Sequence, residues 1–410
     1  MKNFILLVLS ALILGCSTDK IAERADIKWQ NIYDQLQEAF ILAESGDTIN
    51  IPAGHFHFDK SLLLDDKDSI VIIGAGIDKS VLSFKAQSEG AEGIKVSNCT
   101  GIQFIDFTIE DAAGDNIKVN DTDGITFRRV KAQWTGAVNE ENGAYAFYPV
   151  LCKNVLIENC IAMGASDAGI YVGQSDTVII RNNIAELNVA GIESENSNMV
   201  EIYGNRAERN TGGILVFDLP GLTQYGANIK VYDNVIRSNN YRNFAPEGNI
   251  VGVVPPGTGL MVLATKEVEI ADNIIKDNRT VGIAVISYEL VAAISKTDED
   301  AQQEEGSTQT VNNNYKLDES YNPFPSAIRI KDNKLSNSHW FATFSHDFGK
   351  LFNFKFPFNP PDIVFDGFVK AGLNKTEILC IHQPGNSFVN LDAPNDLDNI
   401  NENVEEFVCE

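Results

Sequence analysis

The chain has 410 residues, 44% of them hydrophobic, and its 31 glycines and 13 prolines are too few for a disordered or collagen-like protein. Its formal charge of −25 disfavours nucleic acid and anionic lipid headgroups as partners, so no nucleic-acid function is expected. The length is large for one ordinary core but suits a solenoid, which grows along a single axis.

Residues 1–15 predict a signal peptide rather than part of the fold. Lys2 precedes the apolar run of residues 4–14, which is shorter than the roughly 20 residues of a membrane-spanning helix. The run ends in Ile13-Leu14-Gly15-Cys16, which resembles the lipobox of bacterial lipoproteins and implies a diacylglycerol on Cys16. The residue after the Cys is Ser17 rather than an Asp, and this resembles the pattern of lipoproteins that are sent on to the outer membrane. A lipid anchor in the bacterial cell envelope is therefore expected; an ordinary signal peptide with a chance cysteine is the alternative.

Residues 16–59 are expected to form a linker and an N-terminal cap. Apolar residues recur at helical spacing over residues 32–43, and a Gly-Asp turn and a short strand follow at residues 46–51. Solenoids need such covers at their exposed ends. The segment resembles the N-terminal cap of many pectate-lyase-like β-helices.

Residues 60–337 carry a repeat of about 22 residues that predicts a right-handed parallel β-helix. One strand type begins with Gly and an apolar residue, at Gly169, Gly191, Gly213, Gly259 and Gly282. The other has two alternating apolar residues and then Asn, at Asn183, Asn205, Asn234, Asn273 and Asn333. Alternation gives each strand one buried face, and the stacked Asn amides can form a ladder because an amide both donates and accepts.

Leucine-rich repeats have a similar period, but the Leu-x-x-Leu-x-Leu skeleton is absent and β-branched residues dominate. Cys160 occupies an Asn position of the ladder, so we expect a buried free thiol there.

Insertions interrupt the repeat near residues 219–228, 241–258 and 290–325. Residues 338–410, rich in Phe and Pro, are expected to form a C-terminal cap with an acidic tail. Cys380 and Cys409 both lie in this segment, and an exported protein can form a disulfide between them.

A candidate site follows from stacking the strands on Gly143, Gly169, Gly191 and Gly213. The alignment predicts three outward rows: Tyr145, Tyr171, Glu193 and Leu215; Phe147, Gly173, Glu195 and Phe217; Tyr148, Gln174, Asn196 and Asp218. Aromatic rings beside carboxylates suit a sugar, whose apolar face stacks on a ring while its hydroxyls bind acceptors.

The expected catalytic residues are Glu193, Glu195 and Asp218. The expected substrate-binding residues are Tyr145, Tyr148, Asp167, Tyr171, Gln174 and Asn196. The alternatives are a merely solvated sheet face, or an Asp218 that satisfies backbone groups in the turn after it. The carboxylates could also hold Ca²⁺, although no loop with Ca²⁺-ligand spacing is present and no other metal or cofactor is predicted. The motifs of polygalacturonase-type hydrolases and alginate epimerases are missing.

The segments 143–149, 166–175, 188–193, 210–222 and 243–246 resemble the parallel β-helix repeat lipoproteins of bacterial envelopes. Together with the residues between them they span roughly a third of the chain, which is too long for the similarity to arise by chance. The resemblance implies the pectin-lyase-like fold, an envelope location and a possible partner in a second exported protein, while the activity of that family is not established. Two functions remain open: binding or modifying a polysaccharide or oligosaccharide, or a non-catalytic scaffold that docks the exported partner.

Overall fold

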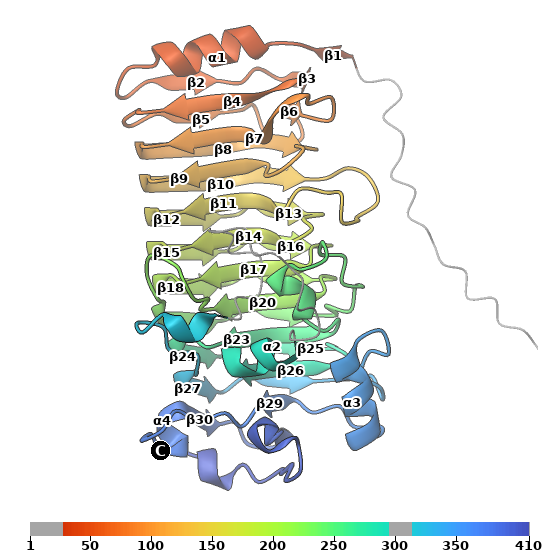
Figure 1. Cartoon of the computed structure of the whole chain (residues 1–410). Helices are drawn as coiled ribbons and strands as arrows, with labels where there is room; N and C mark the ends of the chain where they lie inside the picture. The colour runs from red at the N-terminus through yellow and green to blue at the C-terminus, as the bar shows by residue number, and fades with distance from the viewer. Residues whose placement is uncertain (1–27, 295–313, 410) are drawn as a thin grey trace, which may run out of the picture.

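The computed structural model describes residues 28–294 and 314–409. The expected signal peptide, Cys16 and the part of the third insertion at residues 295–313 lie outside the described residues. The rest forms a column of stacked parallel strands that starts beneath helix α1 (Tyr33–Leu42), as Figure 1 shows. The predicted parallel β-helix is therefore confirmed.

The first sheet wraps around a corner of the column, so that most turns contribute two of its strands. Among the described residues it contains β1 (Trp29–Gln30), β2 (Thr48–Asn50), β3 (Gly54–His57), β5 (Val71–Ile73), β6 (Ser80–Ser83), β8 (Thr100–Glu110), β10 (Asp123–Gln133), β12 (Lys153–Glu158), β13 (Ile161–Met163), β15 (Asp176–Arg181), β16 (Ile184–Glu186), β18 (Asn198–Tyr203), β19 (Arg206–Glu208), β21 (Ala227–Tyr232), β22 (Val235–Arg237), β24 (Lys266–Ala271), β25 (Ile274–Lys276), β27 (Ser326–Lys331), β28 (Lys334–Ser336) and β30 (Leu379–His382).

The second sheet takes one strand from each turn and carries the candidate site. Its strands, in spatial order, are β4 (Lys60–Asp65), β7 (Glu89–Ser97), β9 (Ile117–Asn120), β11 (Tyr145–Val150), β14 (Ala168–Gly173), β17 (Ala190–Glu195), β20 (Gly212–Phe217), β23 (Thr258–Leu263), β26 (Val281–Ile286), β29 (Ile363–Phe365) and β31 (Phe388–Asn390).

Helices are few and lie at the ends of the column or against its outer surface (Figure 1). Besides α1 they are α2 (Tyr288–Ile294), α3 (Asp347–Lys355) and α4 (Lys375–Ile378), with 3₁₀ turns η1 (Ile250–Val253), η2 (Tyr315–Leu317), η3 (Ala393–Asn395) and η4 (Glu405–Phe407). α1 covers the open end: its Leu36 and Phe40 are buried, and Gln37 bonds the backbone of Leu63 in β4 at 2.9 and 3.0 Å. In the part of the chain that the structure describes, no helix has the length and apolarity needed to cross a membrane.

Aligned apolar residues fill the interior. In the second sheet Phe147, Ile170, Ile192, Ile214 and Leu260 pair in register from β11 to β23, and all are fully buried. Burial of each such side chain stabilises the fold by about 1.5–3 kcal/mol, so each turn is held by its neighbours.

The predicted Asn ladder is confirmed. Each Asn donates from Nδ2 to the Oδ1 of the next, at 3.0 Å from Asn183 to Asn205, 3.0 Å from Asn205 to Asn234 and 2.9 Å from Asn273 to Asn333. The residue before each ladder Asn adopts a left-handed conformation, for example Asn182 at φ 57°, which Asn, Asp and Gly tolerate best. Cys160 heads this column as a buried free thiol, as predicted.

A second ladder, which the sequence analysis did not predict, links Asn188, Asn210, Asn239 and Asn278 at 3.0–3.1 Å. It lies where the chain enters the strands of the second sheet. The backbone N–H of each of the first three also donates to the Oδ1 of the next. Together the two ladders satisfy buried polar groups at two corners of every central turn.

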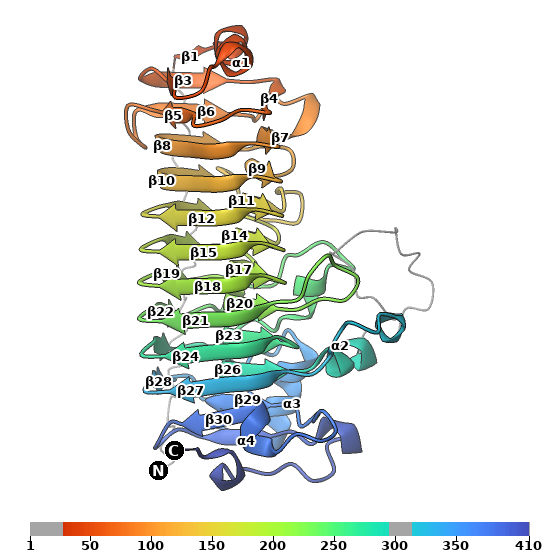
Figure 2. The same ribbon diagram turned by 90° about the vertical axis from the view of Figure 1, so that its left-hand side faces the viewer.

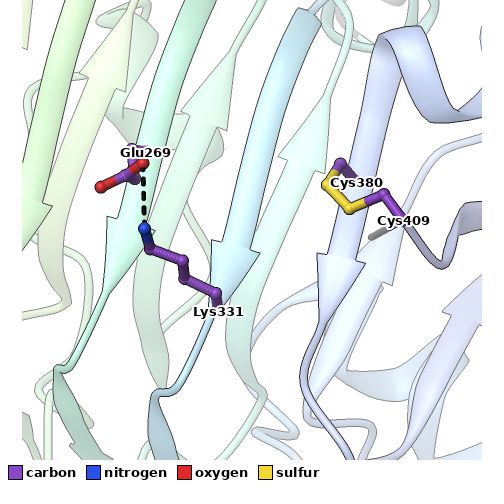
Figure 3. Close-up of a disulfide and its surroundings, with 4 residues drawn as sticks. All are labelled: Glu269, Lys331, Cys380 and Cys409. Carbon is purple, nitrogen blue, oxygen red and sulfur yellow. Dashed lines mark ion pairs between the residues drawn. A yellow bond between two sulfur atoms is a disulfide. The ribbon is translucent and has the colours of Figure 1, made fainter.

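The strand pattern continues beyond residue 337, where a C-terminal cap was expected to begin. β29, β30 and β31 extend both sheets by further turns. The segment expected to be an acidic tail ends on the column: Phe407 is buried against Phe365 and Phe388, and Cys409 forms a disulfide with Cys380 in β30 (Figure 3). Hydrophobic contact and this covalent link explain why a segment so rich in acidic residues is held in place.

Candidate functional site

The register of β11 differs from the alignment made on Gly143. Tyr145 pairs with Ala168, and the residue three positions later, Tyr148, lies beside Tyr171 in the outward row. Gly143 belongs to the approach to the strand, where an added Cβ would lie 1.5 Å from the Gly114 carbonyl oxygen. Ala146 therefore occupies the place that Gly169 has one turn later, and Phe147 points into the core instead of outward.

The corrected central row contains Lys95, Lys118, Tyr148, Tyr171, Glu193, Leu215 and Met261. The row beside it contains Asn120, Val150, Gly173, Glu195, Phe217 and Leu263. Glu193 and Glu195 thus share the outer face, as expected, but the rows also hold two lysines that the sequence alignment did not place there.

Most of this outer face is covered rather than open to solvent. Glu193 is 1% exposed and Glu195 is 2% exposed, because the insertions fold back onto β17 to β26 and form a second apolar layer (Figures 1 and 2). Phe217, Phe244 and Val251 are buried members of that layer. The insertions that follow Asp218 and Tyr241 thus lie over Glu193 and Glu195, and this leaves the two side chains almost no access to solvent.

Four acidic side chains lie beneath or beside the cover, and we call them the carboxyl cluster: Asp167, Glu193 and Glu195, which are buried, and Asp115, which is partly exposed. Tyr145 Oη donates to Asp167 Oδ2 at 3.1 Å, and Tyr171 Oη donates to Glu195 Oε1 at 2.8 Å. Asp167 Oδ1 and Glu193 Oε2 are buried and have no hydrogen-bond partner among the described residues.

These surroundings favour the neutral acids. Burial raises the pKa of Asp167 to about 7, and the Tyr145 hydrogen bond opposes only part of the rise. Burial and the nearby Asp167 raise the pKa of Glu195 to about 8. Burial, Asp167 and Glu195 together raise the pKa of Glu193 well above its ordinary value. A carboxylic acid that keeps its proton near neutral pH can donate a hydrogen bond or act as a general acid.

Gly173 makes room for the Tyr171 ring. A Cβ at Gly173 would lie 2.2 Å from Tyr171 Oη and 2.5 Å from the ring. The missing side chain lets the ring lie across β14 and reach Glu195 on the next strand. The Tyr145 ring packs against Tyr171 with centroids 4.6 Å apart, which fixes both hydroxyls toward the acids.

Three of the expected site residues fasten the insertion at residues 219–226 instead. Asp218 accepts hydrogen bonds from the backbone N–H of Gly226 at 2.8 and 3.1 Å, so it satisfies a backbone group at the end of the insertion rather than in the turn directly after it. Asn196 bonds both backbone groups of Leu219 at 2.8 Å, and Gln174 accepts from Thr223. The polar atoms of these three side chains are therefore occupied by hydrogen bonds within the chain.

The accessible edge of the cluster lies one turn earlier, on β9 and β11. Tyr148 is half-buried, its ring centroid lies 4.4 Å from that of Tyr145, and Lys118 Nζ lies 4.8 Å above the ring. Glu92 lies 3.9 Å from Lys118 and 3.8 Å from Lys95. We call Lys95, Lys118 and Tyr148 the ledge; it carries cations and an aromatic face beside the buried acids.

Asp115 connects the ledge to the cluster. Burial raises its pKa to about 7 against the opposing charge of Lys118. Sequence analysis missed Asp115 and Lys118 because no Gly-apolar strand start marks their turn. The pattern Ile117-x-Val119, with Lys118 pointing outward between two inward residues, was the signal available.

Across residues 28–294 and 314–409, no three His, Cys, Asp or Glu side chains are grouped so that they could hold a metal ion. Burial also favours the protonated form of the cluster acids, whereas Ca²⁺ is held mainly by ionised carboxylates.

A family model described as the right-handed β-helix region matches residues 92–240 and 139–315, which together exceed half of the chain. The chain belongs to this right-handed β-helix family. The cluster and the ledge both lie within the matched part of the β-helix. A search of curated protein sequences found no match.

Several solved β-helix structures are similar in fold. The A-module of mannuronan C-5 epimerase AlgE6 from Azotobacter vinelandii has 18% identity and a TM-score of 0.45, covering 75% of this chain and 84% of that one. DFA-IIIase from Arthrobacter chlorophenolicus A6, without its lid, has 11% identity and a TM-score of 0.48, with coverages of 84% and 92%. An alginate lyase from Paenibacillus sp. str. FPU-7 has 11% identity and a TM-score of 0.44, with coverages of 76% and 95%. These similarities carry no conclusion about activity.

Proposed function

We propose that this protein is a lipid-anchored protein of the bacterial cell envelope that binds a carbohydrate on the ledge and modifies it with a proton from the carboxyl cluster. The lipid is attached to Cys16 and the membrane is the outer one. The observation that carries the proposal is the ledge itself: a half-buried Tyr148 ring, with Lys118 above it, borders acids that are held neutral by burial.

Each part of the ledge matches one property of a sugar. The Tyr148 ring offers an apolar face for stacking, while Lys95 and Lys118 offer donors to hydroxyl or carboxylate oxygens. The side chain of Lys118 is 28% exposed and that of Lys95 is 41% exposed, so a ligand can reach both. Glu193 and Glu195 supply the proton; the Tyr171 hydroxyl orients Glu195, and the Tyr145 hydroxyl orients the neighbouring Asp167.

Replacing Tyr148 with Ala is expected to weaken carbohydrate binding at least tenfold, because the stacking face is lost. Binding is measured on the lipid-free chain (residues 17–410) against neutral and acidic polysaccharides, with and without Ca²⁺. Alginate is included because the name of one of the similar structures refers to it. Tyr203→Ala is the matched control: Tyr203 stacks on Tyr232 at 4.9 Å on the first sheet, away from the ledge.

The same titrations are followed for reducing and unsaturated ends. If product formation disappears in Glu195→Gln while binding remains, the proton donor is a member of the carboxyl cluster. Equal loss of binding in Tyr148→Ala and Tyr203→Ala would contradict the ledge as the binding surface. Absence of carbohydrate binding altogether would contradict the proposal.

The cover over Glu193 and Glu195 favours a second candidate, the non-catalytic scaffold that docks a second exported protein. Insertions that bury two carboxyl groups close the outer face, and their own outer surface is then free for a protein partner. Loss of partner co-purification on deletion of residues 219–228, with carbohydrate binding absent in the intact chain, would support this candidate.

A further inference from the structure

The segment around α3 exposes a group of large aromatic side chains that neither the core nor the proposed site uses. We call it the aromatic patch: Trp340 (71% exposed), Phe341 (39%), Phe344 (62%), Phe354 (81%) and Phe358 (65%). Rings of Phe344 and Phe358 contact Phe341 at 5.9 and 5.2 Å, which joins the segments before and after α3.

The fold holds this patch outward. Phe352 is buried on the inner side of α3, and Asn353 bonds the backbone of Ala342 at 2.9 and 3.2 Å. Gly349 lies so close to the Thr343 carbonyl that a Cβ would be 2.0 Å from the oxygen. With this face fixed to the column, Phe354 must point to solvent. The exposed aromatic area is roughly 600 Å², which is at the upper end of what monomers tolerate without a partner.

The charge of the segment differs from that of the chain. Residues 338–361 contain one acidic residue, Asp347, and two lysines, Lys350 and Lys355, whereas the whole chain carries −25. Lys355 has no ion-pair partner within the residues that the structure describes. An aromatic surface with flanking lysines, whose one acidic residue is paired with Lys350, fits the headgroup boundary of a zwitterionic bilayer.

We propose that the aromatic patch inserts into the surface of a lipid bilayer as a second, non-covalent membrane contact. Four side chains that protrude with more than 60% exposure suit the deformable boundary of a bilayer better than a rigid protein groove. The proposal uses the lipid anchor of the proposed function only to orient the molecule, since the patch itself needs no anchor.

Together, the lipid anchor and the aromatic patch determine how the molecule lies on the membrane. The eleven strands of the second sheet, stacked at about 4.8 Å, make a column about 50 Å long, with α1 at one end and α3 near the other (Figure 1). Residues 17–27 span at most about 40 Å. Both contacts are satisfied when the long axis of the β-helix lies along the membrane plane rather than upright.

The test uses the lipid-free chain (residues 17–410) and vesicles of phosphatidylethanolamine and phosphatidylcholine. We expect cosedimentation with vesicles, and a blue shift of Trp340 fluorescence that is absent in Trp340→Phe. The double variant Trp340→Ser with Phe354→Ser is expected to lose at least tenfold in partitioning. The control, Ile41→Ser with Leu42→Ser, removes two residues that are 61% and 66% exposed at the opposite end and is expected to bind normally.

Failure of the wild-type chain to bind vesicles would overturn the proposal, as would equal loss in both double variants. Concentration-dependent dimerisation that is abolished by the patch substitutions would assign the patch to a second copy of the chain instead. Because the chain tested carries no lipid, a negative result here is separate from any failure of the anchor or of carbohydrate binding.

Discussion

Glu195→Gln is expected to raise the free energy of unfolding at pH 8 by about 4 kcal/mol and to change it little at pH 4.5. In the folded chain the pKa of Glu195 is raised to about 8, so the group is still largely neutral at pH values where the unfolded chain has lost the proton. The stability that depends on the neutral form is complete below the ordinary pKa of a glutamate, and it is lost as pH rises toward 8. Gln keeps the shape and the hydrogen bond from Tyr171 but cannot ionise.

The wild-type chain should accordingly be more stable near pH 5 than near pH 8. The raised pKa values of Asp115 and Asp167, each about 7, act in the same direction over the range between the ordinary aspartate value and 7. Urea unfolding at several pH values measures the effect. Glu201→Gln is the matched control, because Glu201 also accepts a tyrosine hydrogen bond, from Tyr232 at 3.0 Å, but on the first sheet.

A flat stability profile between pH 5 and 8 in the wild-type chain would contradict the burial of the cluster. The same conclusion would follow if Glu195→Gln and Glu201→Gln shifted the pH profile equally, since repulsion within an acidic chain would then explain the dependence without a special role for Glu195.

Replacing Asn234 with Ala is expected to destabilise the chain by about 3–4 kcal/mol. Asn234 Oδ1 accepts from both the backbone N–H and the Nδ2 of Asn205, at 2.9 and 3.0 Å, and Asn234 Nδ2 donates to the Ile202 carbonyl and to Asn273. Ala leaves several buried polar groups without partners in the middle of the column, where neither water nor another side chain replaces them.

Chemical denaturation measures this loss. Asn198→Ala serves as the control, because Asn198 lies on the neighbouring β18 but makes no side-chain hydrogen bond within residues 28–294 and 314–409. Its replacement is expected to cost under about 0.5 kcal/mol. Equal effects of the two substitutions would mean that the ladder contributes no stability beyond that of an ordinary surface asparagine.

The fold could be predicted because its signal is repeated. The strands at Gly169, Gly191 and Gly213 have equal spacing and similar inward residues. A turn that departs from the pattern can therefore still be recognised from its neighbours. The second ladder was missed because Asn188 and Asn210 precede the glycine strands and follow no apolar alternation of their own. The C-terminal strands were missed because long excursions separate β28, β29 and β30 and conceal the period.

The candidate site could be predicted only in part. Sequence placed Glu193 and Glu195 on one outward face, and that is correct. It placed Tyr145 three residues out of register, because the extra glycine at Gly143 imitates the strand start. The extent of the cover over Glu193 and Glu195 could not be predicted, because it depends on contacts between residues far apart in the chain, such as Tyr321 with the Asp218 carbonyl at 2.8 Å.

Hydrogen–deuterium exchange of the lipid-free chain, with and without the oligosaccharide that binds it best, tests the central claim most directly. The account predicts that the ligand slows exchange in β9, β11 and residues 135–143, around Lys118 and Tyr148, and that Tyr148→Ala abolishes this protection. Protection confined to the first sheet, or bound ligand with no change in exchange at β9 and β11, would contradict the assignment of the ledge as the carbohydrate site.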